Sequence, residues 1–475
     1  MMLEGDTFRE ECGLMAVWGH EEAANLVYLG LYAQQHRGQE GVGIVSVDNT
    51  NGESGKYHVH KGLSLVADVF RDYDFSQLPG NHALGHVRYT TAGGTRLANV
   101  QPLYAEVSKG EIALAHNGNL INAEHLRADL IRHGAIFGSS SDSEVVLHLI
   151  ARAAENIPLE EAVIQAVRQL QGAYSLILMF QDRIMVVRDP AGLRPLCMGT
   201  LDGATIFASE TCALDLLGAH YVRDVAPGEM VVLQNGSELK SFYPFDTIQE
   251  RPCIFEYVYF ARPDSRVFGR SVYPIRKRMG QELAREAGVD ADLVIPVPDS
   301  GTPAAIGFAQ EAGIPFELGL IRNHYVGRTF IEPKQSIRNF GVKIKLNANP
   351  EILNGKRVVV VDDSIVRGTT SKKLIGMLRK AGAKEVHMRI SAPPTTDPCY
   401  YGVDTPEKEK LIASYKSVEE IAEYINVDSL AYLSREGLYK AVQAEVGSMC
   451  DACFTGSYPV GTPLTIGKSS QTKLL

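Results

Sequence analysis

Val358-Val359-Val360-Val361-Asp362-Asp363-Ser364-Ile365-Val366-Arg367-Gly368-Thr369-Thr370 is the stretch that predicts the fold of the second half of the chain. Four consecutive valines are typical of a strand buried on both faces of a parallel sheet, and this strand ends in two acidic residues. Small and hydroxyl-bearing residues follow, and a helix is predicted over 369–381. In an open parallel sheet, ligands bind at the carboxyl ends of the strands, where free N–H groups and the helix dipole attract phosphate. The stretch therefore predicts a phosphate site at a sheet edge.

Helical and strand patterns alternate on both sides of this stretch, which is typical of βαβ units. Helices are predicted over 274–287 and 302–312, strands over 293–295, 316–321 and 385–390, and a helical tail over about 417–445, with a loose end from Ser457 on. We therefore expect an α/β domain with a parallel sheet.

The acids Asp362 and Asp363 cannot themselves hold a phosphate. They suit ribose hydroxyls, or Mg²⁺ carried by a pyrophosphate. A nucleotide-hydrolysing strand of the Walker-B kind is one alternative, but the G-x-x-x-x-G-K-[ST] loop that it requires is absent from the sequence. A strand that simply ends in solvated acids is the other alternative, and the run of Ser, Arg, Gly and two Thr that follows counts against it.

Two neighbouring segments fit the same ligand. Pro298–Thr302 follows the strand that ends near 297, so Ser300 and the backbone around it are expected at the same sheet edge, where they can bind pyrophosphate. This motif is weak alone and also matches a plain strand-to-helix turn. The segment 322–345 is basic, with Glu332 as its only acid. It is interpreted as a lid that closes over a polyanion, with a solvated surface loop as the alternative.

Composition restricts the class of protein. The 475 residues suggest two or three domains, and 45% hydrophobic with 22% charged residues is ordinary for a globular protein. The net charge of −9 argues against nucleic acid as a partner. No apolar run is long enough for a membrane span and the N-terminus lacks the pattern of a secretory signal, so we expect a cytoplasmic protein with no membrane partner. Seven cysteines are then expected as thiols, metal ligands or nucleophiles, with a disulfide framework improbable.

The sequence before residue 240 has a different pattern, in which short strand-like runs enclose a group of helices. Strands are predicted over 13–17, 43–47, 83–88, 112–116, 174–180, 184–187 and 230–233, and helices over 21–35, 122–133, 143–155 and 159–170. Asn122 is expected to cap the second helix and Gly134 to end it. The pattern predicts a layered α+β domain with sheets packed between helices.

Four motifs occur in order within this first half: Cys12-Gly13-Leu14 with Gln35–Glu40, then His86–Thr90, Ala115–Asn119 and Ser141–Glu144. Together they resemble the glutamine amidotransferases whose nucleophile is an N-terminal cysteine, which implies an αββα sandwich. If residues 1–11 are a propeptide, their removal gives Cys12 a free α-amine. An α-amine has a pKa near ~8, which suits it as the base for its own thiol.

The resemblance assigns roles to particular residues. Arg88 would bind the glutamine carboxylate, Asp142 would bind the glutamine ammonium, and Arg37 would lie near the glutamine pocket. The Asn117 side-chain amide and the Gly118 N–H would form the oxyanion hole. Each has a plainer interpretation: Arg88 as a surface ion pair, Asn117-Gly118 as a turn, and Asp142 as a helix cap. The ordered occurrence of all four motifs favours the functional interpretation.

The close pair Cys450-x-x-Cys453 is consistent with several kinds of site. Alone it suits a redox pair or half of a zinc site, and with Cys253 and Cys399 it could hold an iron–sulfur cluster. Buried thiols without a function are the default, and they are our expectation for Cys197 and Cys212.

The stretch that ends at Thr370 resembles the signature of the phosphoribosyltransferases that use phosphoribosyl pyrophosphate (PRPP). The resemblance implies that Asp362 and Asp363 face the ribose hydroxyls and, with Ser300, the Mg²⁺. The residues expected to cradle the 5-phosphate are Ser364, Arg367, Gly368, Thr369 and Thr370.

A glutaminase half joined to a PRPP-binding half resembles the amidophosphoribosyltransferase family from Cys12 to about Phe454. The resemblance implies that glutamine, PRPP and water give phosphoribosylamine, glutamate and pyrophosphate, the first step of purine synthesis, with ammonia passing between the sites. It implies a homotetramer or homodimer and feedback inhibition by purine nucleotides. It also implies a [4Fe–4S] cluster on Cys253, Cys399, Cys450 and Cys453, with zinc as the alternative. The expected parts are a propeptide (1–11), a glutaminase domain (12–240), a phosphoribosyltransferase domain (241–455) and a tail (456–475).

Two other functions remain as alternatives. The glucosamine-phosphate-forming amidotransferases share the glutaminase half, but they need a sugar-isomerase half where this chain has residues 358–370. A non-catalytic regulator that binds PRPP would be expected to have lost Cys12, Asn117 or the acid pair, and all are present. Glutamate release from glutamine separates such a regulator from an enzyme.

Overall fold

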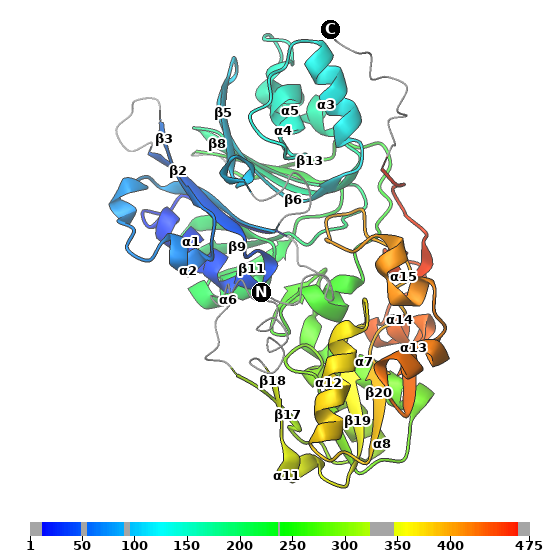
Figure 1. Ribbon diagram of the computed structural model, residues 1–475. Coiled ribbons are helices and arrows are strands. Elements are labelled where there is room, and N and C mark those ends of the chain that lie inside the picture. Colours follow the sequence, from blue (N-terminus) through cyan, green and yellow to red (C-terminus); the bar gives the residue numbers. More distant parts are fainter. Residues whose placement is uncertain (1–11, 49–54, 90–95, 236–237, 324–345, 464–475) are drawn as a thin grey trace.

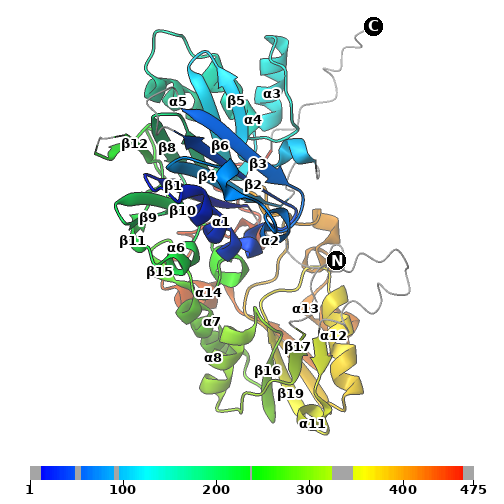
Figure 2. The same ribbon diagram turned by 90° about the vertical axis from the view of Figure 1, so that its left-hand side faces the viewer.

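The computed structural model describes residues 12–48, 55–89, 96–235, 238–323 and 346–463. The first half of the chain forms four layers, helices–sheet–sheet–helices, and the second half forms a separate parallel sheet covered by helices (Figures 1 and 2). The predicted propeptide and most of the predicted lid lie outside the described residues. Among the described residues, none of the helices combines the length and the apolar character that a membrane span requires.

Two antiparallel sheets form the middle of the first half. The seven-stranded sheet has the order β11 (His220–Asp224), β9 (Cys197–Leu201), β10 (Ala204–Ala208), β1 (Gly13–Trp18), β4 (His82–Arg88), β2 (Gly41–Asp48) and β3 (Lys56–Gly62). The six-stranded sheet has the order β13 (Lys240–Phe242), β12 (Met230–Gln234), β8 (Arg183–Arg188), β7 (Gly172–Met179), β6 (Gly110–Leu120) and β5 (Leu103–Val107). The layered α+β prediction is confirmed.

Strand β1 shows why the two sheets stack. Its side chains alternate, so Met15 and Val17 pack against the helices while Leu14, Ala16 and Trp18 face the other sheet. Both faces are apolar because both are covered. Helices α1 (Ala23–Ala33), α2 (Val66–Val69) and α6 (Thr211–Leu217) cover the seven-stranded sheet, and α3 (Ala123–Arg132), α4 (Glu144–Ala151) and α5 (Leu159–Val167) cover the six-stranded one. Short 3-10 turns are η1 (Gln35–Arg37), η2 (Phe75–Gln77) and η3 (Leu97–Asn99).

The second half contains a four-stranded parallel sheet in the order β16 (Leu293–Pro296), β19 (Arg357–Asp362), β20 (Glu385–Ile390) and β21 (Ser429–Tyr432). Val359 and Val361 of β19 face one core with α7 (Val272–Ala287), α8 (Thr302–Ala312) and α14 (Arg435–Val442). Val358 and Val360 face the other core with α12 (Thr369–Lys380) and α13 (Val418–Ile425). The predicted doubly covered strand is confirmed, because the valine run is buried from both sides.

Shorter elements complete the second half. They are a π-helix (η4, Glu256–Phe260), β14 (Arg266–Val267), β15 (Arg270–Ser271), β17 (Leu320–Arg322), β18 (Leu346–Ala348), α11 (Pro350–Leu353), η5 (Lys408–Lys410), η6 (Ile412–Ser414) and α15 (Ala452–Thr455). Figure 1 shows that the layer of α1 and α6 in the first half faces the second half. Glu256 of η4 pairs with Arg37 of the first half, so η4 lies at this junction. The predicted boundary at residue 240 falls inside β13, so the sheet of the first half extends to Phe242.

Two predicted elements of the second half are wrong. The run 316–321 is not a strand of the parallel sheet: Phe316 makes one bridge with Val294, and β17 then pairs antiparallel with β18. Between the two, Gly319 packs closely against Ile295, and a Cβ there would lie 2.8 Å from the Ile295 Cγ2 atom. The tail over 417–445 is not continuously helical, because β21 interrupts it and adds the edge strand.

Two local expectations also differ from the structure. Asn122 lies at the start of α3, but its side chain does not cap the helix; Nδ2 donates to the Gln169 carbonyl at 2.8 Å and Oδ1 accepts from Gln171 N at 3.0 Å. The end from Ser457 on is not loose as far as residue 463. The Tyr458 hydroxyl donates to the Pro398 carbonyl at 2.6 Å, and the Tyr401 hydroxyl donates to the Gly461 carbonyl at 2.7 Å.

Candidate active sites

Cys12 lies at the entrance of β1, with 7% of its surface exposed. Gly13 pairs with Val87 of β4, so Cys12 lies beside the carboxyl end of β4, where Arg88 is also buried. The Cys12 Sγ is 4.0 Å from the Tyr89 carbonyl oxygen, which is a weak contact. The register therefore brings two of the predicted residues, the thiol and the guanidinium, to the same edge of one sheet.

Asn117 reaches this edge from the facing sheet. Its Nδ2 donates to Ser209 Oγ at 3.3 Å, and the same Oγ accepts from Leu14 N at 3.0 Å. One hydroxyl therefore fixes the Asn117 amide beside the start of β1. Gly118 has φ +139°, and a Cβ there would lie 2.1 Å from the Ala173 carbonyl oxygen, so only glycine fits.

Asp142 precedes α4 and is held against β6. Its Oδ2 accepts from Leu120 N at 3.0 Å, two residues beyond Gly118. The helix-cap alternative does not describe this contact, because Ser143 is the residue at the N-cap. Asp142 therefore lies at the carboxyl end of β6, the strand that carries Asn117 and Gly118.

Arg37 lies near these residues but is held by two carboxylates. Its Cβ lies 3.4 Å from the position a Gly13 Cβ would occupy, its Nε pairs with Glu210, and its Nη2 pairs with Glu256. Glu256 in turn accepts from Arg194 Nη1 at 3.3 Å. We call Arg37, Glu210, Glu256 and Arg194 the junction quartet; each is at most 1% exposed.

The junction quartet joins the two halves. Glu256 belongs to η4 of the second half, and Glu210 also accepts from Arg262 N at 2.9 Å and from the Ser265 hydroxyl at 2.7 Å. Burial alone would raise the pKa of Glu210, but Arg37 and His36 hold it well below its ordinary value. Glu210 is therefore an anion between the halves of the chain. Sequence analysis found only Arg37 of the four.

The acid pair lies where the sequence predicts it. Asp362 ends β19, and Asp363 follows it with 6% of its surface exposed. Burial and the charge of Asp363 raise the pKa of Asp362 well above its ordinary value. Burial also raises the pKa of Asp363, against hydrogen bonds from Ser300 and Ser364 and the charge of Arg276. Two adjacent carboxylates that repel each other in this way fit a divalent cation.

The loops on either side of the acid pair meet it. Gly368 has φ +75° and is the N-cap of α12, so Thr369 and Thr370 form the first turn of the helix, whose N-terminal end favours an anion. A Cβ at Gly301 would lie 2.4 Å from the Val361 carbonyl oxygen, so the 298–302 turn passes directly over the end of β19. Ser300 and 362–370 thus share one sheet edge, as predicted.

Arg276 of α7 is a further charge beside the acid pair that sequence analysis missed. It is 3% exposed, and it donates from Nε to the Tyr257 carbonyl at 2.8 Å and from Nη2 to the Ala261 carbonyl at 2.7 Å. Helix η4 therefore lies between the two sites: Arg276 reaches it from the acid pair and Arg37 reaches it from the glutaminase side. Arg276 lies inside the amphipathic pattern of a predicted helix, so the sequence around it does not indicate a functional site.

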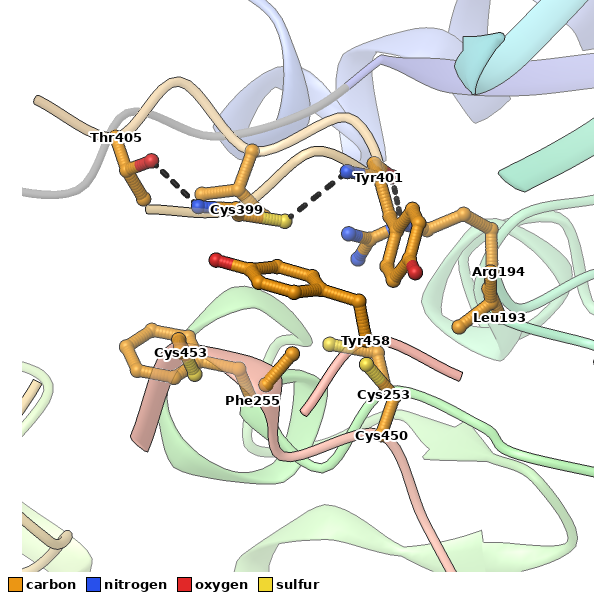
Figure 3. Close-up of a pocket in the computed structure, with 12 residues that line it drawn as sticks. Leu193, Arg194, Cys253, Phe255, Cys399, Tyr401, Thr405, Cys450, Cys453 and Tyr458 are labelled. Atoms are coloured by element: carbon orange, nitrogen blue, oxygen red, sulfur yellow. Dashed lines mark hydrogen bonds between the residues drawn. The ribbon is translucent and has the colours of Figure 1, made fainter. Parts of the chain in front are cut away.

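The four predicted cluster ligands line one apolar cavity (Figure 3). The backbones of Cys253 and Cys450 form an isolated β-bridge, and Cys450 N donates to the Pro252 carbonyl at 2.9 Å. Cys399 accepts from Tyr401 N at 3.3 Å. In Figure 3 the ring of Tyr458 projects between Cys399 and the other three sulfurs.

Burial raises the pKa of Cys450 and Cys453 well above the ordinary value, so these thiols need a metal to become thiolates. In the described part of the chain, no three His, Cys, Asp or Glu side chains surround one point closely enough for a single metal ion. Four thiols that line one apolar cavity are the donor set of an iron–sulfur cluster, while the Tyr458 ring lies between Cys399 and the other three sulfurs. Cys197 and Cys212 are buried elsewhere, as expected.

The fold and the two sites define a two-domain glutamine amidotransferase with a phosphoribosyltransferase half. A family model described as a glutamine amidotransferase domain matches residues 88–216, and one described as a phosphoribosyl transferase domain matches residues 272–429. An amidophosphoribosyltransferase from Rhizobium etli is 52% identical, over 99% of this chain and 96% of the relative. The chain belongs to the amidophosphoribosyltransferase family.

Two solved structures agree with this assignment. One is titled as the glutamine PRPP amidotransferase from B. subtilis complexed with ADP and GMP; the other is titled as the allosteric regulatory enzyme of purine biosynthesis. Each is 48% identical to this chain, with a TM-score of 0.89 over 95% of this chain and 98% of the solved chain.

Proposed function

We propose that the chain transfers the amide nitrogen of glutamine to PRPP, giving phosphoribosylamine, glutamate and pyrophosphate in purine biosynthesis, through the residues described above. The observation that carries the proposal is the presence, in one molecule, of a cysteine–asparagine–aspartate site at one sheet edge and a phosphate loop with an acid pair at another. Family membership supports the overall reaction, and the residue roles are our assignment.

In the first half, Cys12 attacks the amide carbon of glutamine. The carbonyl oxygen becomes an oxyanion that Asn117 Nδ2 and Gly118 N–H stabilise, and its collapse expels ammonia and leaves a thioester. Water then hydrolyses the thioester to glutamate and regenerates the thiol. Arg88 and Asp142 orient the substrate through its carboxylate and ammonium groups. The α-amine of Cys12 serves as the base once residues 1–11 are removed.

In the second half, ammonia attacks C1 of the ribose, the C1–oxygen bond breaks, and pyrophosphate leaves. Thr369, Thr370 and the first turn of α12 hold the 5-phosphate, and Ser300 with the turn around it faces the pyrophosphate. Asp362 and Asp363 face the ribose hydroxyls and, with Ser300, would hold Mg²⁺. When bound, Mg²⁺ neutralises charge on the leaving pyrophosphate. The predicted lid over 322–345 would exclude water from this site.

We further propose a [4Fe–4S] cluster on Cys253, Cys399, Cys450 and Cys453, with zinc as the alternative. The four thiols come from the domain junction, the loop after β20 and the C-terminal segment, so a cluster would have a structural role in joining them. Feedback inhibition by purine nucleotides is supported by the ADP and GMP named for the B. subtilis structure. A homotetramer or homodimer and a cytoplasmic location stay predictions.

The test is glutamate release from glutamine by anaerobically purified protein, with and without PRPP and Mg²⁺. We expect PRPP to stimulate release strongly and phosphoribosylamine to form with it. Glutamate release without PRPP-dependent pyrophosphate would favour another amidotransferase class. If neither glutamate nor ammonia-dependent pyrophosphate is produced, the regulator alternative stands. Pyrophosphate from ammonia without glutamate release would indicate an unprocessed N-terminus, which mass spectrometry of the purified chain checks.

A further inference from the structure

A loop of the second half, residues 399–402, packs against the predicted oxyanion hole of the first half, and we call it the contact loop. The Tyr400 carbonyl of this loop accepts from Asn119 Nδ2 at 2.9 Å. A Cβ on Gly402 would lie 3.0 Å from both the Cα and the carbonyl carbon of Gly118, so no side chain fits between the two glycines. The contact loop therefore touches β6 at the residues that follow Asn117.

Gly118 depends on its neighbours for its orientation. Glycine has the widest backbone freedom of any residue, and Gly118 has φ +139°, which other residues rarely adopt. The Ala173 carbonyl oxygen confines Gly118 within the first half, and Gly402 confines it from the second half. A catalytic donor has to be held within about 10–20° of its productive direction. The contacts that confine Gly118 therefore also set the direction of its N–H.

The residues on either side of this glycine are fixed one by one. Asn117 Nδ2 donates to Ser209 Oγ, and Leu120 N donates to Asp142 Oδ2, so both are held by the first half. Asn119 differs from them, because its side chain donates to a carbonyl that lies 281 positions further along the chain. The second half thus holds one part of the oxyanion strand.

The contact loop is itself held at several points. Cys399 N donates to Thr405 Oγ1 at 2.7 Å and Tyr401 N donates to Cys399 Sγ at 3.3 Å, as the dashed lines in Figure 3 show. Arg194 Nε donates to the Tyr401 carbonyl at 3.0 Å, and the Tyr401 hydroxyl donates to the Gly461 carbonyl. Arg194 belongs to the junction quartet, so the loop is tied to the same buried charges that join the two halves.

We propose that Asn119 and Gly402 are positioning residues for the glutaminase reaction: together they hold Gly118 so that its N–H points at the oxyanion. This deepens the proposed function and rests on Gly118 as an oxyanion donor. A misplacement of about 1 Å in an active site can cost about a hundredfold in rate. An oxyanion forms when Cys12 attacks glutamine and again when water attacks the thioester, so kcat depends on this donor whichever step limits it.

The test compares glutamate release by Asn119→Ala with that by a matched control, Asn122→Ala. The control removes two hydrogen bonds at the same end of β6, to Gln169 and Gln171, and both lie within the first half. We expect Asn119→Ala to lower kcat about tenfold while the KM for glutamine stays within about twofold. We expect Asn122→Ala to lower the midpoint of thermal unfolding and to leave kcat within about twofold.

Gly402→Ala tests the same contact from the second half. Its Cβ would press on the backbone of Gly118, and φ +111° disfavours alanine, so we expect kcat to fall about a hundredfold. Two reactions of Asn119→Ala that need no oxyanion donor serve as controls. They are alkylation of Cys12 by iodoacetamide, followed by mass spectrometry of its peptide, and ammonia-dependent pyrophosphate release. Both rates should equal those of the unmodified enzyme.

An unchanged kcat in Asn119→Ala would overturn the proposal. A raised KM with unchanged kcat would also overturn it, since Asn119 would then bind glutamine directly, and so would slower alkylation, which would place the effect on Cys12. An equal loss of kcat in Asn122→Ala would make the effect one of stability alone. If Gly402→Ala does not fold, Asn119→Ala decides the question.

The proposed function and this inference fail in different ways. If the unmodified processed enzyme releases no glutamate, both are wrong. If it releases glutamate and any of the contrary results is found, the inference alone is wrong.

Discussion

Glu256→Gln is the substitution that tests most directly how the two halves are joined. Glu256 is fully buried and pairs with Arg37 and Arg194 at once, and its Oε1 lies 3.3 Å from Arg194 Nη1. Glutamine has nearly the same shape, so the change removes one charge and places an amide donor against a guanidinium. The buried site then holds two guanidiniums and only Glu210 as an anion.

The expected loss of stability is large because the buried charges have no contact with water. Removing one partner of a buried ion pair typically costs about 3–5 kcal/mol, since the remaining charge stays uncompensated. For 475 residues, an unfolding entropy of about 2.1 cal/mol/K per residue gives about 1 kcal/mol/K if the chain unfolds as one unit. The midpoint of thermal unfolding should then fall by about 3–5 °C, and by more if one half unfolds alone.

The assay is differential scanning calorimetry of Glu256→Gln, Arg194→Met and the double variant. The double variant leaves Arg37 paired with Glu210 and restores the charge balance. Its loss of stability should therefore be clearly smaller than the sum of the losses in the two single variants. A surface control is Glu407→Gln, whose partner Lys410 is exposed and whose pair should contribute almost nothing. Additive losses in the double variant, or a midpoint for Glu256→Gln within 1 °C of the unmodified protein, would refute the reasoning.

Four further outcomes follow from the sites. Cys12→Ala should abolish glutamate release and leave ammonia-dependent pyrophosphate release, both measured on the same preparation. Asp363→Asn should weaken PRPP and Mg²⁺ binding by tenfold or more in calorimetric titration, because one of two buried carboxylates is lost. Cys450→Ser should remove the visible absorbance of an iron–sulfur cluster and its bound iron, read by elemental analysis. Burial lowers the pKa of His86 to about 3, so between about pH 6.5 and pH 3 the unfolded chain binds a proton that the folded chain does not. The free energy of unfolding therefore falls as the pH drops through this range. His86→Gln should reduce this fall by up to about 1.4 kcal/mol per pH unit, measured by urea titrations at several pH values.

Local pattern was sufficient for the elements that carry the chemistry. The valine run over 358–361 and the glycine at 368 specify a doubly buried strand and a helix start without help from the rest of the chain. Cys12 precedes a strand and Asp142 precedes a helix, as expected, whereas the strand predicted over 112–116 extends to Leu120 and includes Asn117. These predictions succeed because periodicity, turn residues and burial all act over a few neighbouring positions.

The features that sequence analysis did not predict depend on contacts between residues far apart in the chain. Sequence analysis predicted that residues 429–432 belong to a helical tail. They form β21 instead, because the edge of β20 offers backbone hydrogen-bond partners more than forty positions away in the chain. The ion pairs of Glu256 join residues 62 and 219 positions apart, and no local pattern encodes a partner at that distance.

The junction quartet also has a consequence for how this chain can be recombined. Arg37, Arg194 and Glu210 belong to the first half and Glu256 to the second, so neither half is electrically balanced on its own. A crossover between homologous genes at the linker after Phe242 would produce a sound hybrid only where both parents carry the matching charges. A hybrid with an unrelated second half would leave Arg37 and Arg194 without the Glu256 carboxylate, so it would need a new buried anion at that place.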